Sequence, residues 1–233
     1  MLLRGRQPDI RQVAVVTRSL QFNKLLSRIL ADWKFFSVAD LSAANVIIAE
    51  RGLDLPAHNA HVVWLTSMPL REGSFLMVPI CLTQLYHSLE IHLFPIPRRH
   101  IRVAMETAVD LQLDNNRFAG QLVSLSGRGG RITCAHEIPC GKMLHIEVKL
   151  AGRFLKIQSE VLYCIPAGDS SSRRQPHVGV LFKPSNGYDF DMLRRFIEKI
   201  SIERACARED ILSTDLCLTW LDVTTNPWDA KDA

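Results

Sequence analysis

The sequence has no long apolar run. Of its 233 residues, 47% are hydrophobic, but uninterrupted apolar stretches such as Val13–Val16 span only a few positions. A helix needs roughly 20 consecutive apolar residues to cross a bilayer, and the basic N-terminus lacks the apolar core of a secretion signal. The composition therefore predicts a cytoplasmic protein without a membrane span, and a chain long enough for two domains.

Recognisable metal and catalytic motifs are also missing. None of the six cysteines stands in a CxxC pair, and Cys134, His136 and Cys140 lie close together without the usual ligand spacing of a zinc site. The chain has no GxSxG nucleophile motif and no phosphate-binding P-loop. We therefore expect reduced thiols, no metal, no cofactor and no enzymatic activity.

The net charge is only +4, but arginine is concentrated in one segment. Between positions 98 and 131 the chain has six arginines and three acidic residues. Because the guanidinium fork matches phosphate geometry, this excess indicates an anionic partner. The segment lacks the interleaved aromatic residues on which single-stranded RNA or DNA stacks its bases. We therefore expect no nucleic-acid polymer as a partner.

Residues 10–93 combine the patterns of strands and helices. Ser19 is a suitable N-cap for a helix over 20–33, and a second helix is expected over 80–93. Short apolar segments predict strands at 10–17, 35–40, 45–49, 61–66 and 74–78. This alternation predicts a parallel sheet. Because some connections are too short for crossover helices, we expect a trimmed α/β domain.

The pattern changes after a linker at 94–102, which contains two prolines. Several short alternating segments separated by Gly-rich turns then predict a six-stranded antiparallel barrel. The barrel and a helix that begins near Asp189 would occupy residues 103–204, with a polar loop at 167–176 between the last two strands. For residues 205–233 we expect a further helix, over 205–224, and a tail.

Two motifs carry the functional hypothesis. Arg98 and Arg102 form an RxxxR motif in the linker, and Ser124, Ser126 and Gly129 form an SxSxxG motif further on. With the barrel pattern behind them, these residues resemble the PilZ domain family, which is marked by RxxxR followed by (D/N)xSxxG. The resemblance covers about residues 96–200. It implies a six-stranded barrel that acts as a receptor for cyclic di-GMP.

The chemistry of the motifs agrees with this ligand, which carries two phosphates and two guanines. Arginine matches a phosphate, contacts the O6 and N7 edge of guanine and stacks on purines. Ser124 stands where the family has Asp or Asn, and losing one charge-assisted bond costs roughly 1–3 kcal/mol. The residues expected to bind the ligand are Arg98, Arg99, Arg102, Ser124, Ser126 and Gly129.

The N-terminal segment resembles a response-regulator receiver domain, less specifically. Glu50 ends a predicted strand at the place of the phospho-accepting aspartate, while Thr66 and Pro79 match the receiver threonine and proline. The acidic pair expected after the first strand is replaced by Thr17 and Arg18. Without those acids we expect no Mg²⁺ site and no phosphotransfer. A plain α/β docking domain is the alternative interpretation.

Two hypotheses for function follow. The first is a cyclic di-GMP effector whose ligand changes the orientation of the two domains and the contacts with an unidentified protein partner. The second is a PilZ adaptor that works in protein–protein interaction without nucleotide. The Arg98/Arg102 pair favours the first hypothesis and Ser124 favours the second. The sequence leaves open whether the protein is a homodimer.

Overall fold

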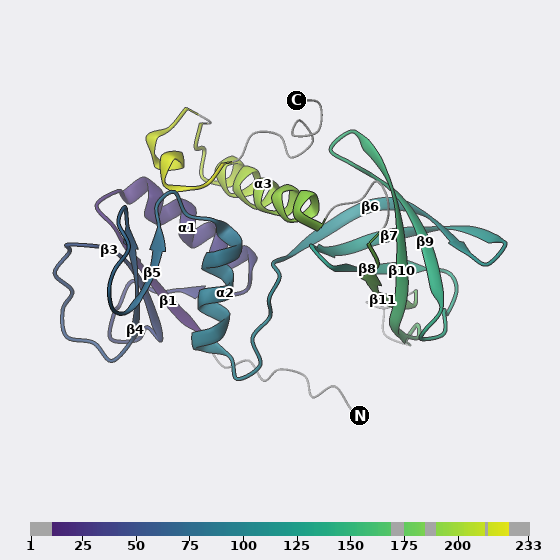
Figure 1. Ribbon diagram of the computed structural model, residues 1–233, viewed down its shortest axis with the longest axis horizontal. Coiled ribbons are helices and arrows are strands. Elements are labelled where there is room, and N and C mark those ends of the chain that lie inside the picture. The colour runs from purple at the N-terminus through teal and green to yellow at the C-terminus, as the bar shows by residue number, and fades with distance from the viewer. Residues whose placement is uncertain (1–10, 169–174, 185–189, 213, 224–233) are drawn as a thin grey trace. The chain divides into compact units, whose positions relative to one another are not determined.

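The computed structural model describes residues 11–168, 175–184, 190–212 and 214–223 and divides into two compact units (Figure 1). The α/β unit comprises Met1–Arg99 and Glu198–Thr224, and the barrel unit comprises His100–Ile197 with Thr225–Ala233. Within the residues that the structure describes, the chain passes from one unit to the other after Arg99 and again within helix α3 (Phe190–Arg208). Most of the predicted polar loop at 167–176 lies outside the described residues.

The α/β unit is built on a five-stranded sheet in the order β2-β1-β3-β4-β5, with every neighbouring pair parallel. This is the flavodoxin-like strand order. Only the connection between β1 and β2 holds a helix; the other three connections are loops and turns, as predicted for a trimmed unit. The strands are β1 (Gln12–Val16), β2 (Phe36–Ser37), β3 (Val46–Glu50), β4 (His61–Thr66) and β5 (Ser74–Met77).

Two helices lie on one face of this sheet (Figure 1). Helix α1 (Leu20–Asp32) begins at Ser19, whose hydroxyl accepts a hydrogen bond from the Phe22 amide at 3.2 Å, so the predicted N-cap is confirmed. Helix α2 (Leu82–Leu93) follows β5. On the opposite face, Ile47 and Ala49 form an apolar cluster with loop residues that include Leu41 and Leu55. Loops therefore replace the missing crossover helices as cover.

A buried carboxylate caps helix α2. The N-cap residue Cys81 makes no side-chain capping bond in its own helix. Instead, Glu198 of α3 accepts hydrogen bonds from the Thr83 amide, at 3.1 Å, and from the Thr83 hydroxyl. Glu198 is only 4% exposed, and its charge complements the positive end of the helix dipole. The second part of α3 is therefore an integral component of the α/β unit.

The end of the described chain differs from the helix expected over 205–224. Helix α3 runs unbroken to Arg208, and Asp210 then takes a left-handed conformation with φ 51°, which a continuing helix does not allow. A short 3₁₀ helix (Leu216–Trp220) follows. Its Trp220 ring stacks on Phe22 of α1 at 5.1 Å between centroids, and Leu221 forms a bridge to Ile80. Tertiary packing thus overrides the local helical pattern.

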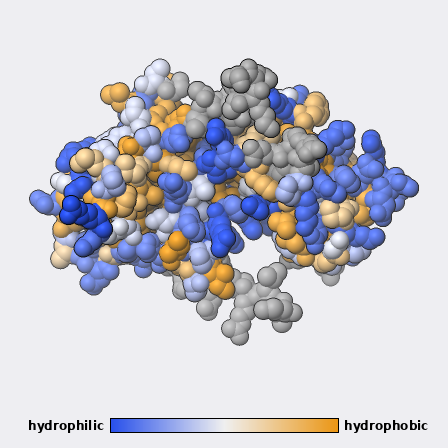
Figure 2. All heavy atoms as spheres, viewed as in Figure 1, coloured by the Kyte–Doolittle hydropathy of each residue, from blue (hydrophilic) through white to orange (hydrophobic). Residues whose placement is uncertain are grey.

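The barrel unit confirms the predicted six-stranded antiparallel barrel. The strands close in the order β10-β11-β8-β7-β6-β9, and every pair is antiparallel. Inward positions such as Leu144, Ile146 and Val148 of β9 are buried. Hydrophilic residues cover much of the visible surface of this unit in Figure 2. The strands are β6 (Arg102–Leu113), β7 (Asn116–Ser126), β8 (Gly129–Cys134), β9 (Met143–Leu150), β10 (Arg153–Ile165) and β11 (His177–Phe182).

Among the described helices, none combines the length and the apolar character that a membrane span requires.

Candidate ligand-binding site

The register of three strands places four of the predicted site residues on one face of the barrel wall. Arg102 of β6 is paired with Ser126 of β7, which is paired in turn with Gly129 of β8. Ser124, two residues before Ser126 on β7, lies on the same side of the sheet. Between Ser126 and Ser124 on β7 stands Leu125, which is paired with Val103 of β6 and Gly130 of β8. The Leu125 and Val103 side chains are buried and face the barrel interior. Arg102 and its row therefore lie on the outer face.

Sequence reasoning missed a fifth member of this face. Arg131 of β8 is paired with Ser124 and is exposed. It follows Gly129 by two positions, so strand alternation alone places it beside the motif. Its row continues to Gly179 of β11 and then to Tyr163 of β10. We call Arg102, Ser124, Ser126, Gly129 and Arg131 the motif face; it combines two guanidinium groups with two serines.

Neighbouring backbone segments come close together at Ser126 and Gly129, and this explains the residue types at both positions. The Ser126 hydroxyl is buried and donates to the carbonyl oxygen of Gly129 at 3.0 Å, across the two-residue turn that joins β7 to β8. A Cβ atom on Gly129 would lie 2.3 Å from the Val180 carbonyl oxygen of β11, closer than such atoms approach. Position 129 therefore requires glycine, and the tight hairpin follows from it.

Arg128, in the turn between β7 and β8, contacts the first residue of helix α3. Arg128 accepts a hydrogen bond from the Phe182 amide at its carbonyl oxygen, at 3.0 Å. Its guanidinium carbon lies 4.4 Å from the ring centroid of Phe190, the first residue of α3. A cation–π contact of this kind contributes about 0.5–1 kcal/mol at an exposed site. Arg128 thus joins the motif hairpin to the helix, a role that the sequence pattern did not predict.

The first two arginines of the motif segment belong to the α/β unit. The side chains of Arg98 and Arg99 are exposed. The Arg98 amide donates to the Glu90 carboxylate of α2 at 2.7 Å. The predicted linker is therefore attached to α2 at Arg98, and regular structure resumes at Arg102, the first residue of β6.

The carboxyl edge of the parallel sheet carries the receiver-like residues. Glu50 at the end of β3 forms an ion pair with the Arg18 guanidinium and accepts a hydrogen bond from the Arg18 amide at 2.9 Å. The Thr66 hydroxyl donates to the Met68 carbonyl oxygen at 2.8 Å, and Pro79 follows a cis peptide bond. Arg18 thus presents a cation to Glu50 at the position where a receiver has metal-binding acids.

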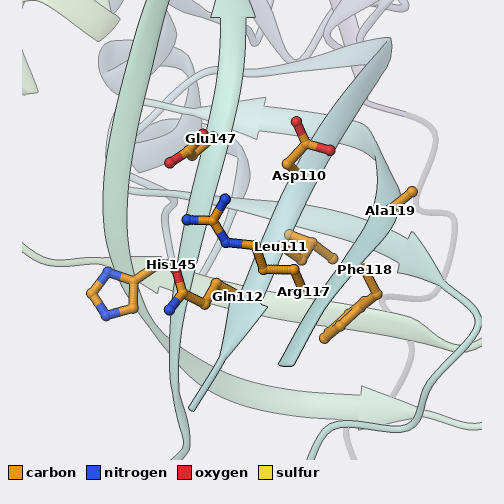
Figure 3. Close-up of a pocket in the computed structure, with 8 residues that line it drawn as sticks. All are labelled: Asp110, Leu111, Gln112, Arg117, Phe118, Ala119, His145 and Glu147. Atoms are coloured by element: carbon orange, nitrogen blue, oxygen red, sulfur yellow. The ribbon is translucent and has the colours of Figure 1, made fainter. Parts of the chain in front are cut away.

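A separate open pocket of about 360 Å³ lies on strands β6, β7 and β9 (Figure 3). Its first lining residue on β6, Asp110, follows Arg102 by eight residues, which corresponds to about 25 Å along the strand. Acidic residues and Arg117 line the pocket. The Lys156 ammonium beside the pocket, and less strongly Arg117, lower the pKa of the Glu147 carboxyl. None of the predicted site residues takes part. The lining residues are Asp110, Leu111, Gln112, Arg117, Phe118, Ala119, His145 and Glu147.

The sequence of the barrel identifies its family. Residues 97–199 match the family model of the PilZ domain. This chain therefore contains a PilZ domain, and the predicted resemblance is confirmed. No curated protein matches the chain.

Several solved structures are similar to this chain over about half of its length. The PilZ domain of YcgR from Escherichia coli, solved with c-di-GMP, is 19% identical with a TM-score of 0.40, over 50% of this chain and 100% of that one. The inhibitor of motility MotI from Bacillus subtilis is 12% identical with a TM-score of 0.39, over 46% and 52%. MrkH of K. pneumonia, in its c-di-GMP complex, is 16% identical with a TM-score of 0.38, over 48% and 54%. The similarity thus spans about half the length of MotI and MrkH.

Replacing Gly129 with alanine should destabilise the barrel, because the added methyl group collides with the Val180 carbonyl oxygen. Overpacking of this kind costs about 1–3 kcal/mol, and urea denaturation followed by circular dichroism would measure it. Gly127→Ala is the matched control in the same turn, since its Cβ would meet only the His100 ring nitrogen at 3.9 Å. Equal unfolding midpoints for the two variants would contradict the assigned role of Gly129.

Proposed function

We propose that this protein is a cyclic di-GMP receptor that signals through its α/β unit and carries out no catalysis itself. The observation that carries the proposal is the motif face, where strand register gathers Arg102, Ser124, Ser126 and Gly129 on one outer surface of a PilZ barrel. Arginines suit both the phosphates and the guanine edges of this ligand. Arg98 and Arg99 supply further exposed guanidinium groups just before the barrel.

Each residue has a specific role in the proposed complex. Arg98 and Arg102 are the main anchors for phosphate or guanine, and Arg99 adds positive charge beside them. Ser124 offers a hydroxyl to the ligand, while Ser126 and Gly129 form the hairpin against which it lies. The ligand is the only small molecule required, and no metal or cofactor takes part. As predicted from the sequence, the protein acts in the cytoplasm.

The second part of the proposal concerns the signal. Arg98 belongs to the α/β unit and Arg102 to the barrel unit. A ligand that engages both arginines restrains the three residues between them, and this changes the preferred orientation of the two units. The new orientation alters the contacts with a protein partner, which the chemistry of the chain does not identify. A homodimer stays compatible with this scheme.

The adaptor hypothesis is the alternative, and Ser124 is the observation that favours it. A serine at this position cannot form the charged hydrogen bonds of a carboxylate. Its cross-strand partner Arg131 consequently faces a neutral hydroxyl-bearing residue. A PilZ barrel of this composition can act as a protein-binding module even without nucleotide. Direct titration separates the two hypotheses.

Replacing either Arg98 or Arg102 with alanine should weaken cyclic di-GMP binding by about 2 kcal/mol, or roughly thirtyfold, because a charged contact is lost. Isothermal titration of the full chain measures this. Arg117→Ala is a suitable control, since Arg117 is exposed on the same barrel near the opposite end of β7. If the unmodified protein binds no ligand at near-millimolar concentration, the receptor proposal fails and the adaptor hypothesis replaces it.

Replacing Ser124 with aspartate should tighten binding by about tenfold, because the carboxylate can form the charge-assisted bonds that serine cannot. Gln121→Asp adds the same charge at an exposed position of the same strand and should leave the affinity within about twofold. An unchanged or weaker affinity in the Ser124 variant would mean that this position belongs to a differently arranged pocket.

Saturating ligand should also change the small-angle scattering profile of the full chain, because restraining the segment between Arg98 and Arg102 alters the orientation of the units. The Arg102→Ala variant at the same ligand concentration is the control and should scatter like the free protein. Ligand binding with an unchanged profile would refute the orientation step while leaving the receptor role intact.

A further inference from the structure

The buried carboxylate of Glu90 lies behind the RxxxR segment. Glu90 is on helix α2 and is only 1% exposed, which is rare for an ionisable side chain. Burial at this depth requires several hydrogen-bond donors around the carboxylate. Two of these donors come from Tyr86 and Arg98. All three residues belong to the α/β unit.

The donors approach the two oxygens of the carboxylate separately. The Tyr86 hydroxyl, one helical turn before Glu90, donates to Oε1 at 2.9 Å. The backbone amide of Arg98 donates to Oε2 at 2.7 Å. Bonds to a charged acceptor are about twice as strong as neutral ones. Glu90 therefore holds the backbone of Arg98 eight residues away in the sequence.

Tyr86 extends this contact to the Arg98 side chain. The Tyr86 ring is buried, and burial together with the neighbouring Glu90 charge raises the pKa of its hydroxyl to about 12, although the positive charge of Arg98 opposes the rise. The hydroxyl thus keeps its proton at neutral pH and donates it toward Glu90. The Tyr86 hydroxyl and the Arg98 amide therefore meet on one carboxylate, and the Arg98 charge acts on the same hydroxyl.

The hydrogen bonds that join the Tyr86 hydroxyl and the Arg98 amide to Glu90, which we call the Arg98 clamp, leave the Arg98 side chain available to a ligand. A guanidinium has five N–H donors, and the Arg98 side chain is exposed although Tyr86 and Glu90 are buried. These donors are suited to meet a phosphate or a guanine edge.

We propose that Tyr86 and Glu90 are positioning residues that order Arg98 before the ligand arrives. This inference rests on the proposed function and adds to it a contribution of the α/β unit to affinity. An arginine that is already placed loses less conformational freedom on binding than a free one, which increases affinity. The segment carrying RxxxR is therefore pre-organised at its first arginine.

Tyr86→Phe is the mildest test, because it removes only the hydroxyl that donates to the carboxylate holding Arg98. Cyclic di-GMP affinity should fall by about three- to tenfold, the range of one lost hydrogen bond. His87→Ala, at an exposed position of the same helix, should bind as the unmodified protein does. An unchanged affinity in the Tyr86 variant would overturn the proposal.

A double-mutant cycle separates positioning from general loss of structure. In the Arg98→Ala background, Tyr86→Phe should cause no further loss of affinity, because the residue through which it acts is already missing. The titration uses high protein and ligand concentrations, so that weak binding stays measurable. The same loss in both backgrounds would show that Tyr86 supports the fold in general and would overturn the proposal.

Amide exchange in the free protein tests the clamp without ligand. The Arg98 amide should exchange slowly in the unmodified chain and at least tenfold faster in Glu90→Gln, measured by nitrogen-15 NMR, while His87→Ala leaves it slow. Equal exchange rates in the Glu90 variant and the unmodified protein would overturn the clamp. If the unmodified chain instead binds no cyclic di-GMP, the proposed function fails, and slow, Glu90-dependent exchange still supports an ordered Arg98.

Discussion

The pairing register of β6, β7 and β8 is the constraint on which the candidate site depends. A slip of one residue on any of these strands would move its motif residues from the outer face into the barrel interior. The register is maintained by the buried row beneath the motif face, in which Val103, Leu125 and Val180 are all largely hidden from solvent. It is also adjusted by irregularities in both β6 and β7 just beyond the motif residues. Core packing inside the barrel therefore fixes the positions of polar groups outside it.

Much of this architecture could be predicted from the sequence, because strands and helices have local periodicities. The Ser19 cap, the parallel sheet and the closed barrel all followed from alternation, spacing and turn residues. The site was predicted only in part. Strand alternation from Gly129 was enough to place Arg131 in the site, but the prediction did not include it. Glu90 depends on burial against a segment outside its own helix, which local periodicity does not reveal. The expected helix after residue 205 failed for a similar reason: the packing of Trp220 on Phe22 decides the conformation there.

The α/β unit uses buried and paired acids for structural purposes. Glu50 is neutralised by Arg18, Glu198 caps α2, and Glu90 receives donors from Tyr86 and Arg98. Each of these carboxylates has specific partners, as burial or proximity to a helix end requires. The acid at the receiver-like edge therefore belongs with the structural ones. The unit has a flavodoxin-like strand order, and its charges stabilise contacts within the fold.

The division of the chain into units has a consequence for biosynthesis. The α/β unit requires both Met1–Arg99 and Glu198–Thr224, so the barrel is inserted within it. As the chain leaves the ribosome, every barrel strand emerges before Glu198 can cap α2 and before Trp220 can stack on Phe22. Domains generally fold as units during synthesis, usually from the N-terminus. Here that order cannot hold for the whole α/β unit: the barrel strands are complete while the unit that begins before them still awaits its last helix.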